Sequence, residues 1–98
     1  MKTIKAPKTF TLKDGGTIAQ GDSMTFVRHG EVSSIGIFLH NGQERKLRYR
    51  NLLKVPGIKT MERWSDEGIA KTVFGAKTEP DGYGPEGEPS WLIAEGMI

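Results

Sequence analysis

The chain has 98 residues, 36% of them hydrophobic, and a formal net charge of +2 at pH 7. This length fits a single domain, residues 1–98, with a modest core. The absence of cysteine excludes a disulfide framework and a thiolate metal site. No stretch is long and apolar enough for a membrane span or a signal-peptide core, so we expect a cytoplasmic protein without membrane contact.

The charge is unevenly distributed along the chain. Residues 1–54 carry ten Lys/Arg and four Asp/Glu, a net charge of +6, whereas residues 55–98 carry four Lys/Arg and eight Asp/Glu, a net charge of −4. Such asymmetry suggests a polyanionic partner for the β-rich first part. It is equally consistent with attraction between the two parts of the chain.

Short strands separated by frequent turns are expected before residue 35. Residues 1–8 predict a basic lead-in or an edge strand, and short strands flank the turn signal at residues 14–16. Another strand is expected from Met24, between turns at residues 21–22 and 29–31. Turns at this spacing are typical of a small antiparallel barrel or a bent sheet.

The stretch 33–55 predicts a central hairpin around Asn41-Gly42, because alternating apolar residues flank this strong turn signal. The alternating residues are Ile35, Ile37 and Leu39 on one side and Leu47 and Tyr49 on the other. A two-residue loop would pair Ile37 with Lys46 and put charges on the apolar face. We therefore expect a three-residue loop, residues 40–42, with a bulge and a left-handed Gly42.

In that register, the even-numbered face of the hairpin is basic and carries one aromatic residue. Such a face suits single-stranded nucleic acid or a phosphate backbone. Phe38 would stack on a base, and the phosphates would be contacted by Lys46, Arg48, Arg50 and Lys54. The alternative is an ordinary solvated face, in which arginine stems cover Phe38.

Residues 58–67 predict an amphipathic helix with Met61 and Trp64 on its apolar face. Gly68 is expected to end this helix in the left-handed conformation, with a Schellman-type contact between Trp64 and Ile69. A short strand containing Val73 and Phe74 is expected within residues 70–78.

The end of the sequence predicts an irregular loop and a second short helix. Residues 75–90 are rich in Gly, Pro and acidic residues, which is typical of a solvated loop, and the acids lack the spacing of an EF-hand. Residues 89–98 predict a helix with Pro89 in its first turn and Gly96 beyond its end, so that Met97 contacts Leu92. Trp64 and Trp91 are expected to cover the sheet or the end of a barrel.

Three resemblances accompany these patterns. The run GDSMTF, followed by GEV and IGI, resembles SH3-like barrels over roughly the first 55 residues. The run LLKVPGIKTMERWSDEGIA resembles helix-turn-helix regions of excisionase-like and MerR-like proteins, which implies that Lys59, Thr60 and Arg63 face DNA. Three acidic residues in the same helix depart from that pattern, because they repel phosphates. Finally, EPDGY and PSWL within residues 58–98 resemble small uncharacterised phage and prophage proteins, which implies an origin and no mechanism.

Residues with the patterns of known catalytic sites are missing. His29 and His40 lie beside predicted turns, and no glycine-rich loop leads into Lys-Ser/Thr and a helix. We expect no enzyme activity, no cofactor and no metal. The sequence therefore predicts an α+β, mainly β domain, a small antiparallel SH3-like barrel or bent sheet followed by two short helices. Its expected function is that of a phage-type module binding DNA or RNA. The alternatives are a module that binds or inhibits a host protein and a structural component of an assembly.

Overall fold

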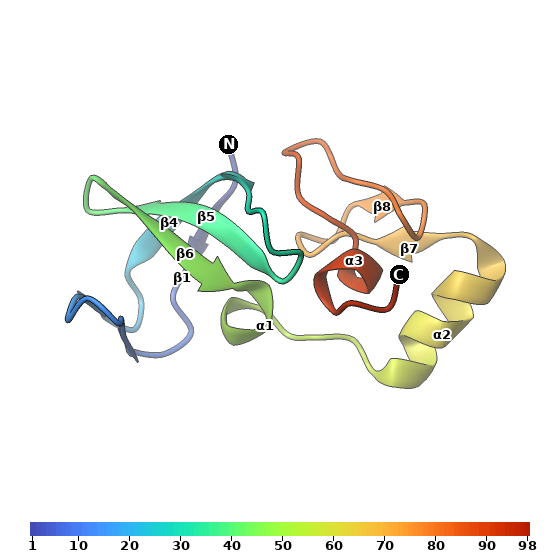
Figure 1. Ribbon diagram of the computed structural model, residues 1–98, viewed down its shortest axis with the longest axis horizontal. Coiled ribbons are helices and arrows are strands. Elements are labelled where there is room, and N and C mark those ends of the chain that lie inside the picture. Colours follow the sequence, from blue (N-terminus) through green and yellow to red (C-terminus); the bar gives the residue numbers. More distant parts are fainter.

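The computed structural model describes residues 1–98, with an antiparallel sheet in the first half of the chain and short helices and hairpins in the second (Figure 1). The main sheet has the strand order β1-β4-β5-β6. These strands are β1 (Thr3–Lys5), β4 (Ser23–His29), β5 (Ile35–His40) and β6 (Gln43–Arg48). The α+β, mainly β class is confirmed. β1 and β6 do not pair with each other, so the sheet is open and does not close into a barrel.

Two short strand pairs accompany the sheet. They are β2 (Phe10–Thr11) with β3 (Thr17–Ile18), and β7 (Ala70–Lys71) with β8 (Lys77–Thr78). The first pair encloses the predicted turn, in which the Asp14 carboxylate accepts a hydrogen bond from Gly16 N–H at 2.9 Å. The second pair corrects the single strand expected at residues 70–78. Val73 and Phe74 lie in its turn, because the Thr72 amide bonds to the Ala76 carbonyl across them.

The hairpin β5–β6 has a two-residue loop, and the expected three-residue loop was wrong. Ile37 pairs with Lys46, and His40 pairs with Gln43. Asn41 and Gly42 both have positive φ, 50° and 78°, which is the geometry of a type I′ turn. This turn matches the right-handed twist of the two strands, and asparagine and glycine adopt it at little cost.

The two-residue loop reverses the predicted faces of β5. Phe38 is fully buried and contacts Phe26 edge to face, with ring centroids 5.5 Å apart. Ile37 lies on the opposite face, opposite Lys46, where the stems of long basic side chains can cover it. In the structure, charged residues of β6 therefore share a face with the isoleucines of β5, which the sequence analysis did not expect. The reason is that the aromatic side chains of the chain converge on the other face.

That converging core is centred on Tyr49, the first residue of α1 (Tyr49–Leu52), where a strand had been expected. The Tyr49 ring lies directly against Gly36. Any other residue at this position would place its Cβ atom only 2.6 Å from the ring. Glycine at this position is therefore required by the close approach of the ring. One hydrophobic cluster joins the sheet to the second half of the chain; it includes Ile18, Met24, Phe26, Phe38, Leu47, Tyr49, Met61, Val73, Trp91 and Leu92.

Helix α2 (Ile58–Glu67) has the predicted bounds. Gly68 is left-handed, with φ 74°, and its N–H donates to the Trp64 carbonyl at 2.9 Å. Ile69 is 56% exposed, so this end is the simpler left-handed motif and not the Schellman motif that we expected. Strand β6 runs directly into the single turn of α1, so residues 48–67 do not form two full helices joined by a turn.

Helix α3 (Trp91–Ala94) is shorter than predicted but ends as expected. Ser90 caps its N-terminus by accepting a hydrogen bond from Ile93 N–H, so Pro89 precedes the helix. At the other end, Met97 N–H donates to the Leu92 carbonyl at 2.9 Å and Gly96 has φ 72°. These are the features of a Schellman motif.

Candidate nucleic-acid interface

The five residues predicted to bind nucleic acid do not form one surface. Phe38 is excluded, because it has no exposed surface and cannot stack on a base. Lys46 and Arg48 lie on the outer face of β6, whereas Arg50 lies in α1, 3.9 Å from Glu95. Lys54 lines a separate cleft next to the two tryptophans. Only Lys46 and Arg48 remain together on the predicted sheet face.

These two residues line a groove of about 550 Å³ between β6 and the β2–β3 hairpin, which we call the β6 groove. The hairpin is held beside β6 by Arg45, whose Nη1 donates to the Asp14 carboxylate at 2.7 Å. The other residues around the groove include Phe10, Leu12, Lys13, Ile35, Glu44, Leu47 and Asn51.

The β6 groove is lined by four cations and two carboxylates, and three of the four cations have no ion-pair partner. Arg45 pairs with Asp14. Arg28, just outside the groove, donates to both carboxylate oxygens of Glu44, at 3.1 Å and 2.9 Å. A hydrogen bond from the Gly16 amide and a second one from Arg45 lower the pKa of Asp14, and the bond from Arg28 lowers that of Glu44. Lys13, Lys46 and Arg48 have no ion-pair partner, so the groove is cationic.

The aromatic residue of the β6 groove is Phe10, which the sequence analysis did not assign to the site. It is half-buried, and the Lys8 ammonium lies 5.4 Å from its ring centroid. Its hairpin is anchored by the buried Ile18 and contacts β6 through Arg45 and Asp14, which lie 31 residues apart in the chain. The local sequence feature that indicates a role for Phe10 is its position between two basic residues, Lys8 and Lys13.

A second group of polar side chains lies inside the fold, where the sheet meets the last loop. The Tyr49 hydroxyl bonds to Nδ1 of His29 at 2.8 Å, and the two rings are stacked. Burial, followed by the charge of Glu88, raises the pKa of Tyr49 well above its usual range, so its hydroxyl stays protonated. A tyrosine held in this state is suited to a structural hydrogen bond and not to attack on a substrate.

Glu88 belongs to this interior group and corrects the solvated acidic loop expected at residues 75–90. It is only 1% exposed. Its two carboxylate oxygens accept hydrogen bonds from the Thr72 hydroxyl at 2.8 Å and from the Glu86 amide at 2.9 Å. Its neighbours Asp81 and Glu86 are exposed, as expected of loop acids. Glu88 therefore ties the loop to the β7–β8 turn.

Because burial lowers the pKa of His29 below its ordinary 6.5, the folded chain binds fewer protons than the unfolded chain as pH falls through this range. The free energy of unfolding should therefore decrease from about pH 6.5 downward, until pH reaches the folded-state pKa. Urea denaturation between pH 7.5 and 5 measures this slope. His29→Phe keeps a ring against Tyr49 and should flatten the slope; an unchanged slope would assign it to another group.

No group of three His, Asp or Glu side chains is arranged to hold a metal ion. None of the helices has the length and apolar character needed to cross a membrane. No family model, curated protein or solved structure matches the chain.

Proposed function

We propose that the protein is a small nucleic-acid-binding module that holds a DNA or RNA strand in the β6 groove. The observation that carries this proposal is the free cationic set Lys13, Lys46 and Arg48 around a groove with one accessible aromatic residue, Phe10. Phosphates would contact the cations, and a base would stack on the Phe10 ring. If the chain is phage-encoded, as its C-terminal resemblance implies, the strand would be met in the host cytoplasm.

Three physical features indicate that the groove binds a nucleic-acid strand and not separate small anions. First, Lys46 and Arg48 are alternate residues of β6 and project from the same face, about 7 Å apart along the strand. Two neighbouring cations on one face can contact more than one phosphate of the same nucleic-acid strand. Second, the acids near the groove are held by arginines and do not oppose phosphate. Third, β6 is an edge strand, so no further strand covers that side of the sheet.

The double variant Lys46→Gln/Arg48→Gln should lose most of its affinity for a single-stranded oligonucleotide, measured by fluorescence anisotropy at increasing salt. Both side chains are exposed, so the fold should be retained. Two lost phosphate contacts should make the slope of log K against log salt shallower by about 1.4 for a single strand or about 1.8 for a duplex. Comparing the two forms also identifies the preferred ligand.

The matched control is Lys59→Gln/Arg63→Gln, which removes the same charge from the exposed face of α2. We expect its affinity and salt slope to stay near those of the unaltered protein. If the α2 variant loses binding and the β6 variant keeps it, the interface lies on α2, as the helix-turn-helix resemblance implies. If neither oligonucleotide binds at low salt, the proposal is wrong.

A protein partner is the second candidate function. It is favoured by two exposed apolar side chains, Leu39 in β5 at 40% and Val32 in the loop before β5 at 57%. Single exposed apolar residues are common, so the argument depends on the position of Leu39 in β5, next to the edge strand β6. A pull-down from host lysate that enriches one protein, and loses it with Leu39→Ser, would support this function.

A further inference from the structure

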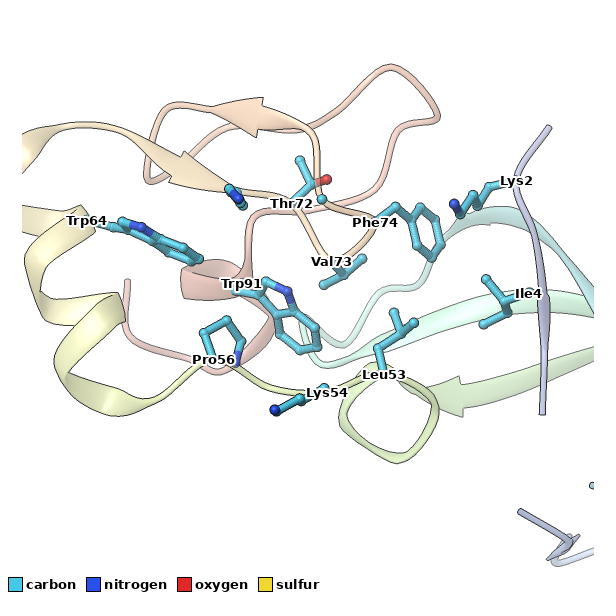
Figure 2. A pocket seen from close by; sticks show the side chains of 12 residues that line it. Lys2, Ile4, Leu53, Lys54, Pro56, Trp64, Thr72, Val73, Phe74 and Trp91 are labelled. Carbon is cyan, nitrogen blue, oxygen red and sulfur yellow. The ribbon is translucent and has the colours of Figure 1, made fainter. Parts of the chain in front are cut away.

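A second cleft, of about 350 Å³, lies where the sheet meets the second half of the chain, and we call it the tryptophan cleft. Figure 2 shows Trp91 in its middle, Trp64 to one side beyond Pro56, and Phe74 to the other side near Lys2. Lys54 lies at its rim below Trp91. The cleft shares no residue with the β6 groove.

The lining of the tryptophan cleft is apolar with a purely cationic rim. Three lysines, Lys2, Lys54 and Lys71, line it together with aromatic and aliphatic side chains, and no Asp or Glu does. None of the three has an ion-pair partner. The Lys2 ammonium lies 5.8 Å from the centroid of the Phe74 ring, so it is partly engaged, whereas Lys54 and Lys71 have no such aromatic contact. The complementary ligand is therefore an anion with a flat apolar part.

We propose that the tryptophan cleft binds a nucleoside monophosphate group, with the base against the half-buried rings of Trp64 and Phe74 and the phosphate on Lys54 and Lys71. Trp91 is only 4% exposed and belongs to the core behind them. The volume is at the small end of ligand pockets, which matches one nucleotide and not a longer polymer segment. Base stacking on aromatic rings tolerates any base, and lysine is a common phosphate ligand. The group can come from a free nucleotide or from the end of a strand held elsewhere on the protein.

Both tryptophans of the chain line this cleft, so tryptophan fluorescence reports on it directly. We expect AMP to quench this fluorescence in a saturable way, excited at a wavelength where adenine does not absorb. Lys54→Gln/Lys71→Gln should weaken binding roughly a hundredfold, since each of the two lost charged contacts is worth about a factor of ten. Adenosine and inorganic phosphate, each carrying half of the ligand, should bind more weakly than AMP.

The groove variant Lys46→Gln/Arg48→Gln is the control that separates this proposal from the proposed function, because it should leave AMP binding unchanged. A 5′-phosphorylated oligonucleotide distinguishes the two sources of the nucleotide group. If it quenches the fluorescence at a much lower concentration than AMP does, the cleft binds strand ends. If the two ligands quench at the same concentration, the cleft binds free nucleotides. The proposal is overturned if neither ligand quenches saturably. It is also overturned if Lys54→Gln/Lys71→Gln binds AMP as tightly as the unaltered protein does.

Discussion

Replacing Tyr49 with alanine is expected to lower the free energy of unfolding by about 3–5 kcal/mol, the range for removing a buried aromatic side chain. Domains of this size have a total stability of only about 5–15 kcal/mol, so the variant should be partly unfolded at 37 °C. The reason is the position of the ring, which is fully buried and lies within 6.4 Å of the Phe26 and Phe38 centroids. Urea denaturation followed by tryptophan fluorescence measures the loss.

Two further variants separate the packing of the Tyr49 ring from its hydroxyl. Tyr49→Phe keeps the ring and loses the hydrogen bond to His29, so it should cost only about 0.5–1.5 kcal/mol. Gly36→Ala drives a methyl group into the ring and should cost about 1–3 kcal/mol in the unaltered protein. In the Tyr49→Ala background that cost should largely vanish, because the ring is gone. Strictly additive effects would show that Gly36 is required for another reason.

Glu88→Ala is expected to have the second largest effect, a loss of roughly 2–5 kcal/mol. It leaves the buried Thr72 hydroxyl and the part-buried Glu86 amide without their acceptor, and an unsatisfied buried donor costs about 1–3 kcal/mol. The loop from residue 79 to residue 90 should then open. Amide hydrogen exchange at Glu86 and denaturant unfolding measure the local and the global effect.

Glu88→Gln and Glu86→Gln are the matched controls. The first retains the shape of the side chain and one acceptor oxygen, so its effect should be intermediate. The second neutralises an exposed neighbour whose only ion pair is with the terminal amine, at 3.5 Å, and should change stability little. Equal effects of Glu86→Gln and Glu88→Ala would contradict the assignment of Glu88 as the residue that anchors the loop.

The elements that the sequence predicted correctly depend on local signals. The sequence predicted helix α2 and the end of α3 because Gly68 and Gly96 adopt the left-handed conformation at helix ends. The apolar residues of α2 also have helical spacing. The hairpin itself was readable from Asn41-Gly42. Each of these features is decided by residues within a few positions of one another.

The features that the sequence did not predict depend on residues distant in the chain. The face of β5 that enters the core is selected by Tyr49 and by the C-terminal residues around Trp91, and not by the alternation within β5. The same holds for the two clefts: the β6 groove combines β6 with the β2–β3 hairpin, and the tryptophan cleft combines residues from Lys2 to Trp91. The sequence placed Phe38 on one face with Lys46 and Arg48, whereas in the structure Phe38 is buried and Phe10 lines the groove with these two residues.

The place of Trp91, Leu92 and Ala94 in the shared core has a consequence for biosynthesis. All four strands of the main sheet precede residue 49, yet the apolar face of the sheet is covered in part by residues 91–94. A ribosome exposes the sheet residues first, and residues within the exit tunnel cannot yet pack on them. The apolar face of the nascent sheet therefore stays partly exposed to solvent until α3 leaves the ribosome. Chaperones that bind apolar surface would find their target during this interval and lose it once α3 docks.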